Sequence, residues 1–156
     1  MGIAIMMEEF LAEQDVRYDL LRHAPTMTSM RTAEAGHIRG DHLAKGVVLK
    51  DDTGYLLAVL PATYHLRLDA LEAQTHRRLG LAAEQDMARL FPDCAWGAVP
   101  VFGTVYGLES IVDDSIANRP DIYFEGGDHE TLVHMDGDDF QRLTVRAAHG
   151  RFSEHN

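Results

Sequence analysis

The chain has 156 residues and a mass of 17.4 kDa, which suffices for one domain with a hydrophobic core over residues 1–156. Hydrophobic residues make up 46% and charged residues 25%, and the apolar runs are far shorter than the roughly 18 residues of a membrane span, so neither a membrane protein nor a disordered chain is expected. The net charge of −11 argues against an extensive surface that binds nucleic acid electrostatically, and no duplex DNA partner is expected.

In the first half of the chain, the apolar residues of 3–14 recur at helical spacing and predict an amphipathic helix. Residues 17–21 indicate a short strand, and 29–37 a short helix with serine and threonine at its start. Residues 45–49 and 55–60 are two β-rich runs joined by a turn that ends in glycine, which predicts a hairpin.

In the second half, residues 67–79 and 83–91 predict two further helices, and residues 92–107 have no steady period and predict a long structured loop. Asp138 is expected to cap a final helix, and the polar segment from His149 to be a frayed tail over residues 149–156. Three short β-rich runs lie between the loop and that helix, at residues 110–113, 122–125 and 131–135. The expected fold is α+β, with strands in the middle and helices outside.

The first ten residues carry Glu8 and Glu9 and lack a basic start, so an export signal is not expected. Cys94 is the only cysteine and allows no internal disulfide, which suits a reducing compartment, so we expect a cytoplasmic protein. A nucleophilic role for Cys94 has little support, because nothing around it in the sequence lowers its pKa. The histidines show no convergent spacing, so neither a metal nor another cofactor is expected.

Lys45 is the strongest candidate for chemistry. Side chains alternate across a strand, so Lys45 shares a face with Val47 and Leu49, while Gly46 and Val48 take the other. If the Val47 and Leu49 face is the core, Lys45 points inward at its rim, where an ammonium is costly to bury without a partner. The alternative is a strand-end lysine whose ammonium reaches solvent.

Four segments in order and spacing resemble the YbaK/prolyl-tRNA synthetase-associated domain family. They are Ala44-Lys45-Gly46-Val47-Val48-Leu49, Leu56-Leu57-Ala58-Val59-Leu60-Pro61, Gly97-Ala98-Val99-Pro100-Val101-Phe102-Gly103, and Gly127-Asp128-His129 before Asp139-Phe140. The resemblance extends from about residue 5 to residue 145. It implies a freestanding aminoacyl-tRNA editing domain with a mixed, barrel-like sheet flanked by helices, which hydrolyses the ester between a wrong amino acid and the 3′ end of tRNA.

The resemblance also assigns expected roles to residues. Lys45 is implied to be the catalytic residue. The substrate-binding residues are expected in the glycine-rich segments around it, with Ser29 from the short helix: Gly46, Gly97, Pro100, Phe102, Gly103, Gly126, Gly127, Asp128 and His129. The turn at residues 126–129 can offer backbone N–H groups to an anion or oxyanion, and the alternative is an ordinary turn between strands.

These residue types suit the hydrolysis of an ester that is already activated. The reaction needs a placed water, a donor for the developing oxyanion and a clamp on the substrate rather than a strong nucleophile. Lys45 can supply a cation to the carbonyl, or to the terminal phosphate and ribose. His129 can position the water or contact the amino-acid side chain, and a hydrogen bond at the pocket edge is its alternative role.

The chain departs from the family pattern at two positions. Gly46 stands where the family commonly has threonine, alanine or asparagine, and Val101 stands where the family has the proline before Phe-Gly, which here is Pro100. Both departures bear on amino-acid specificity. The alternative functions are a non-catalytic module that binds an aminoacyl-tRNA end or a small amino-acid or nucleotide-like ligand, and a partner protein docked to an aminoacyl-tRNA synthetase.

Residues 1–78 hold 9 basic and 11 acidic residues, whereas residues 79–156 hold 5 and 14. An anionic partner is therefore expected to meet the first half or to make a small contact. A pocket for the terminal aminoacyl-adenosine needs few phosphate contacts, for which Lys45, Arg31, Arg39 and Lys50 are candidates. The dependence of tRNA affinity on salt is then expected to be gentle.

Overall fold

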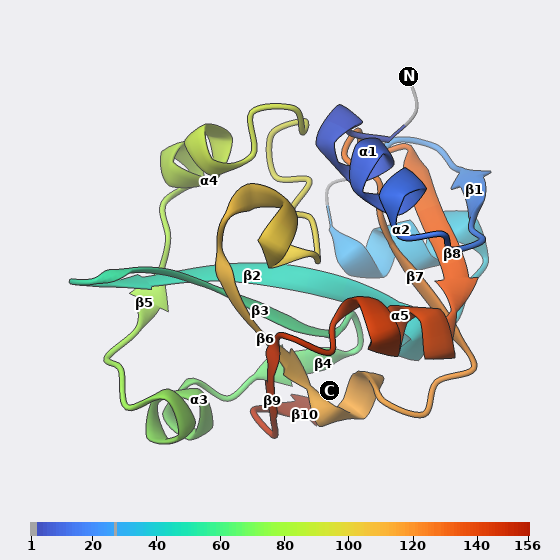
Figure 1. Cartoon of the computed structure of the whole chain (residues 1–156). Coiled ribbons are helices and arrows are strands. Elements are labelled where there is room, and N and C mark those ends of the chain that lie inside the picture. Colours follow the sequence, from blue (N-terminus) through green and yellow to red (C-terminus); the bar gives the residue numbers. More distant parts are fainter. Residues whose placement is uncertain (1–2, 27) are drawn as a thin grey trace.

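The computed structural model describes residues 3–26 and 28–156, and in this part of the chain eight strands form one mixed sheet. The strands are β1 (Asp19–Arg22), β2 (Leu43–Asp51), β3 (Gly54–Pro61), β5 (Gly80–Leu81), β6 (Glu109–Asp113), β7 (Asp121–Glu125), β8 (Thr131–Asp136) and β9 (Ala148–Gly150). Their order is β1-β8-β7-β2-β3-β6-β9, with β5 beside β2 (Figure 1). The β2–β7, β3–β6 and β6–β9 pairs are parallel. A separate two-stranded sheet joins β4 (Tyr64–Leu66) to β10 (Ser153–His155).

Helices cover both faces of this sheet (Figure 1). Buried residues of α1 (Ile5–Glu13) and α5 (Gly137–Leu143) pack in one cluster with Leu57 and Val59 of β3. On the opposite face, Leu71 of α3 (Leu68–Thr75) packs in a second cluster with Leu56 and Leu60. The remaining helices are α2 (Ser29–Gly36), α4 (Glu84–Leu90) and the short 3₁₀ turns η1 (Gly40–His42), η2 (Gly103–Tyr106) and η3 (Asp114–Ile116). The prediction of an α+β fold with a mixed sheet flanked by helices is confirmed.

The predicted hairpin is confirmed as β2 and β3, which pair antiparallel from Ala44–Pro61 to Asp51–Gly54. Sequence reasoning offered the Val47 and Leu49 face as the core, but the hairpin is buried on both sides. Val48 belongs to the cluster under α1 and α5, while Leu49 belongs to the cluster under α3. The hairpin therefore forms the centre of the molecule, with a core on each face.

Asp51 closes the hairpin turn. Its Oδ1 accepts hydrogen bonds from the backbone N–H groups of Thr53 at 2.8 Å and Gly54 at 3.0 Å. Arg77 binds both carboxylate oxygens, through Nε at 2.7 Å and Nη2 at 3.0 Å. These hydrogen bonds, led by those from Arg77, hold the pKa of Asp51 well below its ordinary value.

Because the folded-state pKa of Asp51 is lowered, this carboxylate should stabilise the fold at neutral pH and lose that contribution on acidification. The contribution is complete above the unfolded pKa of about 3.9 and disappears as the pH falls through the lower folded pKa. We expect Asp51→Asn to be less stable than wild type at pH 7, with a difference that shrinks below pH ~4. Urea unfolding of both proteins between pH 7 and pH 3 measures this, and a difference independent of pH would contradict it.

The prediction of a frayed tail at residues 149–156 is wrong. β9 pairs with β6, and β10 pairs with β4. Between these strands Phe152 is buried, and its N–H donates to Oδ1 of Asp113 at 2.7 Å. The final helix also begins two residues earlier than predicted, since its N-cap is Asp136 rather than Asp138 and α5 starts at Gly137. Within the described residues, no helix is both long enough and apolar enough to cross a bilayer.

Candidate functional site

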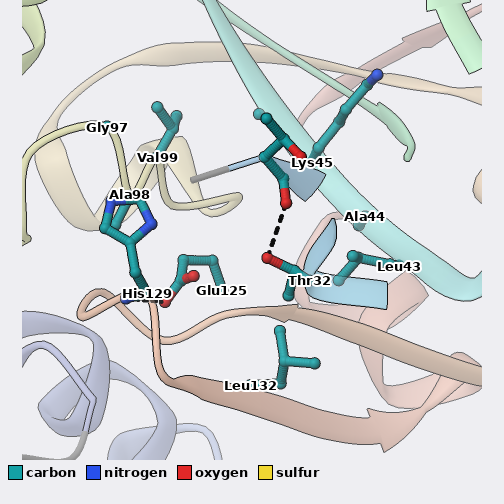
Figure 2. Close-up of a pocket in the computed structure, with 12 residues that line it drawn as sticks. Thr32, Leu43, Ala44, Lys45, Gly97, Ala98, Val99, Glu125, His129 and Leu132 are labelled. Carbon is teal, nitrogen blue, oxygen red and sulfur yellow. Dashed lines mark hydrogen bonds between the residues drawn. The ribbon is translucent and has the colours of Figure 1, made fainter. Parts of the chain in front are cut away.

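A small cavity of about 70 Å³ lies where α2, the start of β2, the loop after α4 and the turn after β7 meet (Figure 2). Polar groups of several types share it with apolar side chains. Its lining residues are Thr28, Thr32, Leu43, Ala44, Lys45, Gly46, Gly97, Ala98, Val99, Glu125, His129 and Leu132. Four of the residues that sequence reasoning assigned to the site are therefore brought together here, namely Lys45, Gly46, Gly97 and His129.

Lys45 lies near the start of β2 and is half-buried. Its ammonium donates to the backbone carbonyl of Ala62 at 3.3 Å. Figure 2 shows the side chain extending away from Glu125 and His129. Burial lowers the pKa of the Lys45 ammonium below its ordinary value. The cation is thus partly desolvated and held by one neutral acceptor, which leaves it able to bind an incoming anion or carbonyl.

Gly46 allows the loop after α4 to contact β2. A Cβ atom at Gly46 would lie 2.7 Å from the carbonyl oxygen of Pro100 and 2.9 Å from Cγ1 of Val99. It would also lie 3.0 Å from Cδ1 of Leu57. Val99 lines the cavity. Because Gly46 has no side chain, this part of the cavity wall can pack directly against β2.

The glycine-rich turn at residues 126–129 has its backbone donors occupied. The N–H groups of Gly127, Asp128 and His129 donate to Oε2 of Glu125 at 2.8, 3.2 and 3.1 Å. The N–H of Gly126 donates to the carbonyl of Thr131 at 2.8 Å. The expectation that this turn offers N–H groups to a substrate anion is not met in this structure, because the carboxylate of Glu125 takes that place.

His129 joins the turn to the loop after α4. Its backbone is in the left-handed region, with φ of 62°, and its Nε2 lies 2.6 Å from the carbonyl oxygen of Trp96. Because a carbonyl only accepts, Nε2 must carry the proton in this contact. In the neutral ring Nδ1 is then an acceptor, which suits the proposed placement of a water molecule.

Other residues assigned to substrate binding lie outside the cavity lining. Phe102 is buried in the core, where its ring packs against those of Phe10, Phe124 and Phe140, so it has no exposed surface for a ligand. Gly103 begins η2 and is buried, with no room for a Cβ beside the carbonyl of Leu108. Pro100 contributes its carbonyl to the contact with Gly46.

The remaining assigned residues belong to the turn and to α2. Gly126 packs against Ile3, and Gly127 has a φ of 128°, which favours glycine. Asp128 accepts from the N–H groups of Glu130 at 2.9 Å and Thr131 at 2.8 Å, so it shapes the turn. Ser29 is the first residue of α2, and its side chain lies outside the part of the chain that the structure describes.

Sequence reasoning missed three polar lining residues, Thr28, Thr32 and Glu125. Thr28 is the N-cap of α2, and Oγ1 of Thr32 donates to the Thr28 carbonyl at 2.9 Å. Their spacing of four residues at a helix start was a usable signal, because such residues lie on one face. For Glu125, the signal was an acidic residue placed two positions before Gly127, within reach of the turn's own N–H groups.

Cys94 has the properties of a structural thiol. Burial raises its pKa to about 12, and Sγ lies 3.6 Å from the hydroxyl of Tyr106. A thiol with this pKa is protonated at neutral pH and is a poor nucleophile. Among the described residues, no group of three or more histidine, cysteine, aspartate and glutamate side chains is arranged to hold a metal ion.

The candidate phosphate-binding cations lie in different places. The ammonium of Lys50 pairs with Asp86 at 3.0 Å, and Lys50 does not line the cavity. Arg31 lies on α2, whose Thr28 and Thr32 line the cavity, and Arg39 lies between α2 and β2. Both arginines are exposed, and unlike Lys50 they lie on segments next to the cavity.

Comparison with known proteins gives a family and a fold. A family model described as an aminoacyl-tRNA editing domain matches residues 23–143, and no curated protein matches. Among solved structures, the hypothetical protein APE2540 superposes with a TM-score of 0.83 at 20% identity, covering 96% of this chain and 99% of that chain. A proposed trans-editing enzyme for prolyl-tRNA synthetase superposes with a TM-score of 0.80 at 20% identity, covering 96% of this chain and 95% of that chain. A proposed signal transduction protein from Marinobacter aquaeolei VT8 gives 0.79 at 22% identity, covering 97% of this chain and 31% of that chain. At these identities the likeness concerns the fold.

Proposed function

The chain belongs to the aminoacyl-tRNA editing domain family, and from this premise we propose that it is a deacylase that hydrolyses the ester of mischarged tRNA in trans. The observation that carries the proposal is the presence of Lys45, a half-buried lysine whose ammonium is held by one neutral carbonyl, among the residues that line a small cavity. Such a cation can exchange the Ala62 carbonyl for a substrate oxygen at little cost, because both are neutral acceptors. The fold likeness to a proposed trans-editing enzyme supports the same activity.

In the proposed mechanism, Lys45 stabilises the negative charge that develops on the ester carbonyl, or binds the phosphate and ribose of the terminal nucleotide. The backbone donors of residues 126–129 are occupied, so the proposal gives the role of donor to the ammonium of Lys45. Nδ1 of His129 holds the attacking water, since Nε2 is committed to the Trp96 carbonyl. No protein nucleophile is required, because an aminoacyl ester is already reactive.

The proposed partner is the 3′ end of an aminoacyl-tRNA in the cytoplasm. A cavity of about 70 Å³ suits a small amino-acid side chain rather than a nucleic-acid duplex. The exposed Arg31 and Arg39 are the proposed phosphate contacts, and two such contacts would give a weak dependence on salt.

A panel of mischarged tRNAs, incubated with the purified protein, tests the activity and identifies the substrate together. We expect release of the amino acid from at least one member of the panel, well above the rate of spontaneous ester hydrolysis, which is measured without protein. Equilibrium binding without turnover across the full panel would contradict the proposal and would favour a non-catalytic module that binds an aminoacyl-tRNA end.

A further inference from the structure

We propose that Glu125 binds the α-ammonium group of the aminoacyl ester and thereby requires a free amino group on the substrate. The inference rests on the proposed function, since it assigns part of the same cavity. Glu125 ends β7 and lines the cavity together with Lys45 and His129 (Figure 2).

The two carboxylate oxygens of Glu125 have different surroundings. Oε2 accepts the three backbone N–H groups of residues 127–129. Oε1 has no hydrogen bond to any residue that the structure describes, and none of the ion pairs among those residues involves Glu125. One oxygen therefore suffices to shape the turn, and the other is left free to accept a hydrogen bond from a cation.

The carboxylate is also held in place from outside the turn. The carbonyl of Gly126 accepts from the N–H of Ala4 at 2.8 Å, and the carbonyl of Gly127 accepts from the N–H of Ala95 at 2.6 Å. The turn is thus tied to the start of α1 and to the loop after α4. A charged group fixed in this way is preorganised, and a ligand that pairs with it loses little energy to reorganisation.

The charges around the cavity match the polarity of an aminoacyl-adenosine. Lys45 carries a positive charge and extends away from Glu125, which carries a negative charge (Figure 2). In the substrate, the ammonium group is attached to the α-carbon next to the ester carbonyl, and the phosphate lies on the nucleotide side. An amino acid pointing toward Glu125 therefore places its carbonyl and nucleotide toward Lys45. A carboxylate next to the ammonium also favours its charged form, which keeps the neighbouring ester electrophilic.

This arrangement separates substrates by their amino group. An N-acylated ester, such as the end of a peptidyl-tRNA, has no positive charge to offer and would leave the half-buried carboxylate unpaired. Because hydrogen bonds to charged groups contribute substantially to binding free energy, we expect the free-amino substrate to bind about tenfold or more tightly than the N-acylated one. The site would then spare nascent peptides while removing single amino acids.

The test uses two amide-linked analogues that cannot be hydrolysed, 3′-(L-alanylamino)-3′-deoxyadenosine and its N-acetyl derivative, with binding measured by calorimetry. We expect wild type to bind the free-amino analogue about tenfold or more tightly than the N-acetyl form. Glu125→Gln keeps an oxygen for the three N–H groups but removes the charge, and we expect its preference to fall to within about twofold. Asp52→Asn, in the exposed hairpin turn, removes the same charge outside the cavity and should keep the wild-type preference.

Equal affinity of wild type for the two analogues, or no binding of the free-amino analogue, would overturn the assignment, as would an unchanged preference in Glu125→Gln. If that variant does not fold, the wild-type comparison still decides. The outcome is separable from the proposed function. Hydrolysis of both aminoacyl-tRNA and N-acetyl-aminoacyl-tRNA at equal rates keeps the deacylase and rejects the ammonium site. Tighter binding of the free-amino analogue without any turnover keeps the ammonium site and rejects the deacylase.

Discussion

Lys45→Ala is expected to lower the rate of deacylation by about 10²- to 10³-fold, the scale found when a donor to a developing oxyanion is removed. The structural reason is that Lys45 is the lysine of the cavity lining, and among the described residues its ammonium has one hydrogen bond, to the Ala62 carbonyl. Loss of that one hydrogen bond should change the free energy of unfolding by only about 1 kcal/mol. Single-turnover deacylation of the best substrate, with urea unfolding in parallel, measures both effects.

Two further variants show whether the cation itself is required. Lys45→Arg keeps the charge but presents a planar fork, so we expect partial activity. Arg146→Ala removes one positive charge from an exposed position after α5 and should leave the rate unchanged. A Lys45→Ala protein that folds and deacylates at the wild-type rate would refute the proposed role of Lys45.

Gly46→Ala is expected to have the second large effect, on stability and activity together. The new methyl group would lie 2.7 Å from the Pro100 carbonyl, which is backbone and cannot turn aside as a side chain can. Overpacking of this kind costs about 1–3 kcal/mol of unfolding free energy. The loop carrying Val99 should move off β2, and a displacement of about 1 Å at a site can lower a rate by up to about 100-fold.

Gly80→Ala provides the matched control for this variant. Gly80 lies in β5, and an added Cβ there meets no atom within 4 Å. Its unfolding free energy and deacylation rate should stay close to those of wild type, as expected for an exposed position. If Gly46→Ala is as stable and as active as Gly80→Ala, the contact between Gly46 and the loop is not what shapes the cavity.

The parts of the fold that could be predicted from sequence are those formed by local pairing and clear periodicity. The β2–β3 hairpin has its turn signal between two apolar runs, and α1 has its apolar residues at helical spacing. β9 and β10 escaped prediction because each is three residues long and contains no large apolar side chain. They become strands through pairing with β6 and β4, which lie far away in the sequence.

The candidate site shows the same division. Lys45 could be selected as a candidate because an inward lysine on an apolar strand is unusual, and it does line the cavity. Phe102 was expected to bind substrate because it belongs to a loop rich in glycine and aromatic residues, which is typical of a pocket wall. In the structure its ring packs in the core against Phe10, Phe124 and Phe140. The role of Glu125 depends on how the following turn folds back on its side chain, and no residue pattern states that directly.

The strand pairing of β1 with β8 also bears on how quickly the protein can acquire its activity. Asp19 and His134 are 115 residues apart in the sequence, yet they are partners in the sheet. The cavity draws on four separated stretches, around residues 28–32, 43–46, 97–99 and 125–132. Chains dominated by such distant contacts fold in milliseconds to seconds rather than microseconds. The reason is that long loops must close, at an entropic cost, before the stabilising contacts can form. The cavity should thus be among the last features to form during folding, well after the central hairpin.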